Sequence, residues 1–181
     1  DMNHLITITA ATGKRHFYIN GANNKLILRY IKLTGGNVQP AGAGGSINIE
    51  GGELNLYFII VYNNLALHGA GIDANSNSVM NIYNSSFIKN VASPGVGGGI
   101  SVDQSKANLY GSNFSLNSGT YGGGINVCKS DVSLQDTIFY SNDATYEGGG
   151  ILTYEYHEIG SSINITRCIF KNNKVTNKDG N

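Results

Sequence analysis

The chain is short of charge, proline and cysteine. Charged residues make up 13% of its 181 residues, about half of the roughly 25% that is usual in globular proteins. Its 12 basic and 12 acidic side chains also cancel. Nucleic acid is therefore not expected as a partner, because phosphate binding needs an excess of positive charge. A run of about 18 apolar residues is absent too, which excludes a membrane-spanning helix from this segment.

Two prolines in the whole chain leave no Pro-rich linker between domains. The composition does not shift along the sequence either, so residues 1–181 are expected to form one domain. The chain begins at Asp1 and not at Met, and this domain is therefore predicted to be a segment of a longer protein.

What the sequence does have is a repeat rich in glycine and asparagine. The tetrapeptide Gly-Gly-Gly-Ile occurs at 97–100, 122–125 and 148–151, and each copy is followed by Phe-x-x-Asn. The same register continues upstream, so that six anchor residues lie 28, 26, 27, 25 and 31 residues apart. These anchors are Leu33, Val61, Phe87, Phe114, Phe139 and Phe170. A period of about 20–50 residues is typical of a solenoid, in which each repeat forms one coil that packs on its neighbours.

Apolar residues alternate within each repeat, with the period of two of a strand and not the 3.6 of a helix. Turn-forming glycine, asparagine and serine separate three such strands per repeat. The predicted fold is all-β: a single-stranded, right-handed parallel β-helix of about six to seven coils, with three short strands per coil. On this template Cys168 points inward and Cys128 points outward from another strand, so a disulfide between them is not expected.

Glycine and asparagine have structural explanations in this fold. One isoleucine per repeat forms an inward column, which consists of Ile47, Ile72, Ile100, Ile125 and Ile151. The glycines before these isoleucines allow a sharp turn, whereas a phosphate-binding loop would need a helix after them. Asparagine recurs three residues after the anchor, where stacked carboxamides are expected to hydrogen-bond along the column and to satisfy backbone groups of the bend. This predicted structural ladder consists of Asn64, Asn90, Asn117, Asn142 and Asn173.

These motifs carry a family resemblance. Gly-Gly-x-Ile together with Phe-x-x-Asn resembles the repeat of chlamydial polymorphic outer-membrane proteins and of the wider set of pectin-lyase-like right-handed β-helix proteins. The segment from His16 to Gly21, which leads into Leu26 to Thr34, resembles the start of such domains. The resemblance covers nearly the whole chain. It implies an extracellular or surface-displayed β-helix that acts as an adhesin, a passenger or a structural module.

The same broad fold hosts polysaccharide lyases and hydrolases, so a catalytic site has to be considered. Such enzymes use clustered carboxylates for general acid–base work or as calcium ligands. The candidates here are Glu50, Asp73 and Asp103, which follow the isoleucine column by three, one and three residues. None lies in a catalytic motif of the family, and no His/Cys spacing suggests a zinc site. The sequence therefore favours solvated carboxylates, without a metal or a cofactor.

Two outward columns offer a different kind of site. Tyrosines lie four residues before three consecutive anchors, and asparagines lie six residues before the same anchors. These residues are Tyr57, Tyr83, Tyr110, Asn55, Asn81 and Asn108. A strip of tyrosines flanked by amides is suited to contact sugar rings or a neighbouring protomer. The alternative is that the aromatic column only stabilises the stacked strands.

Three Asn-x-Ser/Thr triplets, at Asn84, Asn113 and Asn164, are candidate glycosylation sites of a secreted protein. We predict a non-catalytic extracellular or cell-surface module with a structural or adhesive function. Its expected partners are copies of itself, other surface or matrix proteins, or glycans. Open coil edges are adhesive, so either more chain continues the solenoid, which is the preferred expectation, or protomers stack end to end into a filament. The alternative function is that of a carbohydrate-active lyase or hydrolase of the pectin-lyase-like class.

Overall fold

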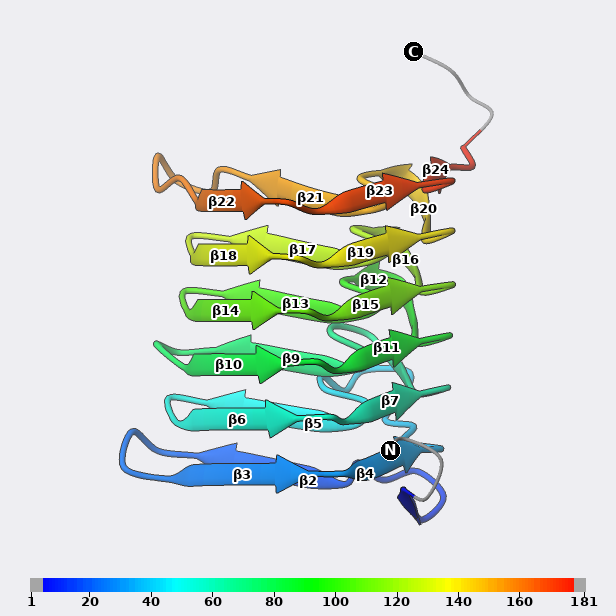
Figure 1. Cartoon of the computed structure of the whole chain (residues 1–181), viewed down its shortest axis with the longest axis vertical. Coiled ribbons are helices and arrows are strands. Elements are labelled where there is room, and N and C mark those ends of the chain that lie inside the picture. Colours follow the sequence, from blue (N-terminus) through cyan, green and yellow to red (C-terminus); the bar gives the residue numbers. More distant parts are fainter. Residues whose placement is uncertain (1–4, 178–181) are drawn as a thin grey trace.

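The computed structural model describes residues 5–177, which form a parallel β-solenoid of about six turns (Figure 1). Its coils lie one above another, from β3 (Lys25–Arg29) at the bottom of the view to β22 (Ser162–Thr166) at the top. The described residues contain strands and turns but no helix. The all-β parallel solenoid predicted from the repeat is confirmed.

Four sheets run the length of the solenoid, and each takes one strand from successive coils. Sheet I contains β2 (Phe17–Asn20), β5 (Ile47–Glu50), β9 (Ile72–Asn75), β13 (Ile100–Asp103), β17 (Ile125–Cys128) and β21 (Ile151–Tyr154). Sheet II contains β3, β6 (Glu53–Tyr57), β10 (Val79–Tyr83), β14 (Lys106–Tyr110), β18 (Asp131–Gln135) and β22. Sheet III contains β1 (Ile6–Thr9), β4 (Ile31–Thr34), β7 (Ile60–Tyr62), β11 (Ser86–Ile88), β15 (Asn113–Ser115), β19 (Ile138–Tyr140) and β23 (Ile169–Lys171). Sheet IV contains β8 (Leu65–Ala66), β12 (Val91–Val96), β16 (Ser118–Tyr121), β20 (Asp143–Glu147) and β24 (Lys174–Val175).

A full coil therefore has four strands, and the prediction of three strands per coil is wrong. The strand that the pattern missed is the one in sheet IV. Its buried positions hold small residues, namely Ala66, Ala92, Gly119 and Ala144, which stand opposite one another in the sheet. A short strand with alanine or glycine inside shows no alternation of large apolar and polar residues.

Equivalent residues of successive coils lie directly above one another. Leu109 stands opposite Leu134, and Leu134 stands opposite Ile165. The rings of Phe87, Phe114, Phe139 and Phe170 form a column with centroid distances of 4.7, 4.9 and 4.8 Å. These distances match the spacing of about 4.8 Å between neighbouring strands, so the stacked backbone sets the stacking of the core.

The asparagine ladder is present at the bend between sheets III and IV, and its members are buried except for the half-buried Asn173. Asn117 Nδ2 donates to Oδ1 of Asn142 (3.0 Å) and to the carbonyl oxygen of Phe87 (2.9 Å). Its Oδ1 accepts from the backbone N–H of Asn90 (3.1 Å) and from Asn90 Nδ2 (3.0 Å). The residue before each ladder asparagine has a left-handed backbone, for example Lys89 with φ 55°. The predicted ladder is confirmed over Asn64, Asn90, Asn117, Asn142 and Asn173.

The two cysteines are free thiols, as expected from the template. Cys168 packs against the hydrophobic core, whereas Cys128 is 4% exposed at the end of β17. Within residues 5–177, no helix has the length and apolar character that a membrane span requires.

Candidate functional site

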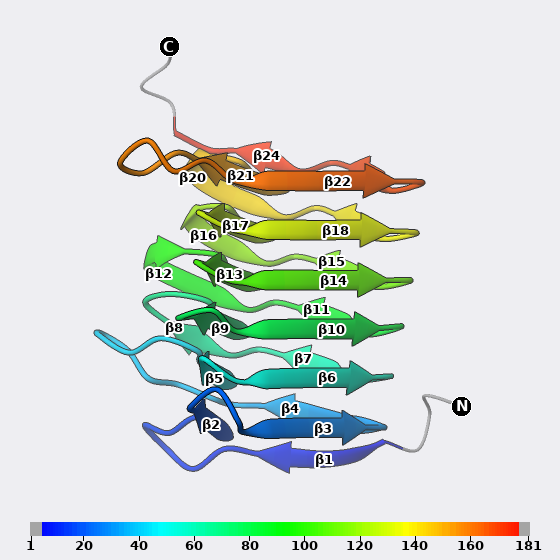
Figure 2. The same ribbon diagram turned by 90° about the vertical axis from the view of Figure 1, so that its left-hand side faces the viewer.

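The outer face of sheet II carries the predicted columns of tyrosine and asparagine. Figure 2 shows the strands of this sheet, β3 to β22, stacked side by side toward the viewer. The register aligns both columns across β6, β10 and β14. We call these six residues the Tyr/Asn strip: Tyr57, Tyr83, Tyr110, Asn55, Asn81 and Asn108.

The asparagines of the Tyr/Asn strip form a hydrogen-bonded ladder of their own. Asn81 Nδ2 donates to Asn55 Oδ1, and Asn108 Nδ2 donates to Asn81 Oδ1, both at 3.0 Å. Asn55 also donates to Glu53 (2.8 Å) and is 6% exposed, so it is buried on the outer face and not open to solvent as expected. Exposure rises along the column, and Asn108 is exposed.

The tyrosines of the strip do not lie in one flat plane. Tyr57 and Tyr83 stack face to face, with centroids 5.1 Å apart and ring planes 5° apart. The Arg29 guanidinium covers Tyr57 at 4.7 Å from its centroid. These two rings therefore support the stacked strands, as the structural interpretation of the column predicted. Tyr110 differs, because it is 42% exposed and the residue opposite it in the next coil is Gln135.

Two adjoining hollows lie beside Tyr110 on the same face. The first has a volume of about 250 Å³. It is lined by Tyr83, Asn108, Leu109, Tyr110, Ser133 and Gln135. The second, of about 240 Å³, shares Asn108 and Ser133 with the first and extends to Asn164. The hollows exist because Ser133 occupies the column position where the preceding coils have asparagine.

An ion pair fixes the surroundings of Tyr110. Arg167 donates from Nε and Nη2 to the two carboxylate oxygens of Asp136, each at 2.7 Å. These bonds hold the pKa of Asp136 below its usual range, and hydrogen bonds from Gln135 and from the Tyr110 hydroxyl lower this pKa further. Tyr110 therefore lies beside the Asp136–Arg167 pair and is largely exposed.

The three candidate carboxylates lie on a different face, the outer side of sheet I. Asp73 lies in one column, between Asn48 and Ser101. Glu50 and Asp103 lie in the neighbouring column, two coils apart. The structure therefore places the three carboxylates on one face but does not stack them directly.

The environments of these carboxylates differ strongly. Burial raises the pKa of Asp73, against the hydrogen bond from Asn75 (2.9 Å). Glu50 is tied to Tyr18 (2.7 Å) and Asn48 (2.9 Å). Among the described residues, the buried oxygens on this face without a hydrogen-bond partner are Oδ1 of Asn48, Asp103 and Asn126. A buried acid with a raised pKa is what a general acid requires, so this face supports the enzyme alternative.

Cys128 and Tyr154 follow Asp103 in its column, one and two coils further toward the last coil. Burial raises the pKa of the Cys128 thiol. Burial, followed by a hydrogen bond with Cys128, raises the pKa of Tyr154 to about 12. Both groups are therefore neutral near pH 7. No group of three or more His, Cys, Asp or Glu that suits a metal ion occurs in residues 5–177.

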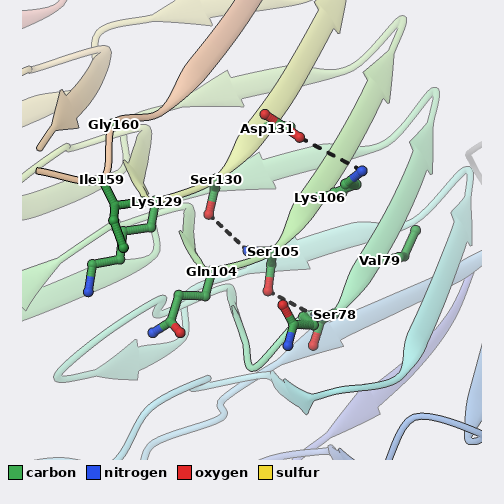
Figure 3. Close-up of a pocket in the computed structure, with 11 residues that line it drawn as sticks. Ser78, Val79, Gln104, Ser105, Lys106, Lys129, Ser130, Asp131, Ile159 and Gly160 are labelled. Carbon is green, nitrogen blue, oxygen red and sulfur yellow. Dashed lines mark hydrogen bonds and ion pairs between the residues drawn. The ribbon is translucent and has the colours of Figure 1, made fainter. Parts of the chain in front are cut away.

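A third surface, at the bend between sheets I and II, was missed by the sequence reasoning. This groove has a volume of about 490 Å³, and Figure 3 shows Gln104 and Lys129 among the side chains that line it. Its floor is a serine ladder in which the Oγ of Ser105 and of Ser130 accepts from the backbone N–H one coil below, at 3.1 and 3.0 Å. The signal in the sequence is the recurrence of serine at the repeat spacing, at positions 78, 105, 130 and 161.

The three predicted glycosylation sites differ in accessibility. Asn164 lies exposed on β22, at the edge of the second hollow. Asn84 is exposed at a bend, with φ 48°. Asn113 is half-buried in β15. Geometry therefore favours Asn84 and Asn164 over Asn113 as acceptors, and their modification stays a prediction.

Comparisons with models of protein families, with curated proteins and with solved structures found no match to this chain.

Proposed function

We propose that this solenoid is a non-catalytic structural or adhesive module of an extracellular or cell-surface protein. Its contact face is the Tyr/Asn strip, and its partners are glycans, other surface or matrix proteins, or a second copy. One observation carries the proposal. The strip's amides are held by one another at 3.0 Å before any ligand arrives, and polar groups fixed in advance lose less entropy on binding.

The proposed relation to pectin-lyase-like β-helices, and to the chlamydial polymorphic outer-membrane proteins among them, rests on the repeat motifs. The triplets at Asn84 and Asn164 are consistent with a secreted protein in a host that glycosylates asparagine. Solubility at 13% charge comes from the many outward asparagine, serine and threonine side chains. These features support the proposal that the protein acts outside the cell.

A joint assay of binding and turnover tests this function. The protein is incubated with a panel of neutral and acidic polysaccharides, with and without calcium, while binding, reducing ends and unsaturated products are followed. Sedimentation in the same buffers reports self-association. The proposal expects binding or self-association without product. Product formation overturns the proposal, and the absence of both glycan binding and self-association overturns glycans and a second copy as its partners.

The second candidate is a carbohydrate-active lyase or hydrolase that works on the outer face of sheet I. The raised pKa of Asp73 and the unpartnered Oδ1 of Asp103 favour it. In this case the assay yields product, and both Asp73→Asn and Asp103→Asn abolish product formation. Tyr110→Ala, on the other face, then leaves turnover unchanged.

A further inference from the structure

We infer that sheet II carries a subsite for an uncharged oligosaccharide, seated over Ser133 between Asn108, Tyr110 and Asn164. This inference deepens the proposed function and rests on it. The two adjoining hollows of about 250 and 240 Å³ form one trough across β14, β18 and β22. Asn108 and Tyr110 are two residues apart on one strand, about 6.6 Å, which suits the contact of two consecutive sugar residues with one strand.

The amide ladder ends at this trough. Asn55 and Asn81 each accept a hydrogen bond from the next coil, but opposite Asn108 the next coil offers the short side chain of Ser133. In residues 5–177, no side chain donates to Asn108 Oδ1, and this residue is exposed. The free acceptor is therefore available to a sugar hydroxyl. Because Asn108 Nδ2 is already bound to Asn81, the direction of the acceptor is fixed.

Tyr110 supplies the apolar surface that sugar recognition needs. Tyr110 is 42% exposed, whereas Tyr57 and Tyr83 cover each other. Its hydroxyl lies near Asp136, which is paired with Arg167. The C–H groups of a sugar ring can pack on this aromatic face while hydroxyls reach Asn108, Gln135 and Asn164.

The charge at the trough favours a neutral ligand. Lys106 and Asp131 line the second hollow and pair with each other at 3.8 Å. Their charges cancel locally, and the remaining polar lining consists of amides and hydroxyls. A uronic-acid polymer would bring an uncompensated negative charge next to Asp131. We therefore expect neutral oligosaccharides to bind in preference to acidic ones.

Two variants test the subsite, and their effect on binding is not expected to come from unfolding. Ser133→Asn places a carboxamide in the trough, where it can continue the ladder from Asn108, so it fills the site and preserves the fold. Tyr110→Ala removes the aromatic face. Tyr140→Ala is the matched control, because Tyr140 is 43% exposed but lies on sheet III. All proteins are produced in bacteria that lack N-glycosylation, so that Asn164 is unmodified.

The probes are cello-, xylo-, manno- and chitohexaose, with hexagalacturonate as the acidic comparison, and affinity is measured by titration calorimetry. We expect at least one neutral hexasaccharide to bind, with affinity lowered at least about tenfold by Tyr110→Ala and by Ser133→Asn. We expect Tyr140→Ala to bind like the wild type. Circular dichroism melts verify that Ser133→Asn is folded.

Each other outcome has a distinct meaning. Neutral binding that survives both variants overturns the subsite but leaves the proposed module function standing. Preference for hexagalacturonate overturns the neutral ligand class. Absence of binding by every probe overturns the subsite, and the polysaccharide and sedimentation assays then decide the proposed function independently. Product released from a hexasaccharide overturns the proposed function itself.

Discussion

Asparagine occupies two columns of this solenoid, and the direction of the side chain separates their roles. In the interior column, Asn117 has both amide protons and its oxygen engaged by backbone and by neighbouring asparagines. In the outer column, Asn108 keeps a free oxygen at the surface. The first arrangement stabilises the bend of each coil, and the second leaves a hydrogen-bond acceptor for a ligand.

The interior column makes a direct prediction for stability. Asn117→Ala removes the side-chain donor to the carbonyl of Phe87 and the acceptor of the Asn90 N–H, both buried. Unsatisfied buried groups cost about 1–3 kcal/mol each, so we expect the free energy of unfolding to fall by about 3 kcal/mol in urea titrations. Asn113→Ala is the control, since Asn113 is half-buried and its side-chain bond to Ser115 is 3.5 Å long. Equal losses in the two variants would contradict the ladder's role.

Asp73 makes a prediction that depends on pH. Its pKa is raised by burial, so the folded state favours the protonated carboxyl. The stability from this proton is complete below the ordinary aspartate pKa of about 3.9, and it is lost as pH rises through the folded pKa. Asp73→Asn should therefore raise Tm by a few degrees at pH 7 and change it little near pH 3.

Thermal melts by circular dichroism at both pH values measure this difference. The exposed Asp131, changed to Asn, serves as the control and should show no such gain at pH 7. If Asp73→Asn lowers Tm at pH 7, the carboxylate is stabilised by its surroundings and the argument from burial fails.

In the Gly-Gly-Gly-Ile corner that leads into a strand of sheet I, each glycine is required for a different reason. Gly97 has a left-handed backbone, with φ 68°. A Cβ on Gly98 would clash with the carbonyl oxygen of Ser118. A Cβ on Gly99 would lie 2.5 Å from the carbonyl oxygen of Gly124 and 2.8 Å from the Phe114 ring. The corner therefore packs backbone against backbone and against the phenylalanine column.

We predict that Gly99→Ala destabilises the solenoid by about 2–3 kcal/mol, because overpacking forces the corner away from Phe114. Gly160→Ala is the matched control, since a Cβ there meets no atom within 4 Å. The measurement is the urea midpoint of each variant at constant slope. A Gly99→Ala midpoint equal to that of Gly160→Ala would show that the corner can relax freely.

The repeat predicts three of the four strands in each coil because large residues mark their inward positions. Ile72, Ile82 and Phe87 are such markers, and all are fully buried. Sheet IV lacks this signal because Ala66 and Ala92 form a small separate cluster with Ala70. A strand can therefore be predicted from alternation only where its inward residues are large, even though its backbone pairs in the same way.

Across the whole solenoid, residues that recur at the repeat spacing line up on one face because the coils stack. The columns of the Tyr/Asn strip are predictable, since residues one repeat apart stand opposite each other. The hollow beside Tyr110 is not predictable, because it depends on which rings stack and on Ser133 following Asn108. The same holds for the burial of Asp73, which is 6% exposed and has Gly69 packed closely against its backbone.

We propose that sheet II, and not sheet I, is the face that contacts glycans. The decisive measurement is a map of backbone amide chemical shifts during titration of the wild-type protein with the neutral hexasaccharides. We expect perturbations confined to β14, β18 and β22, strongest near Asn108, Tyr110 and Ser133. Perturbations centred on β9, β13 and β17, around Asp73 and Asp103, would show that sheet I is the contact face instead.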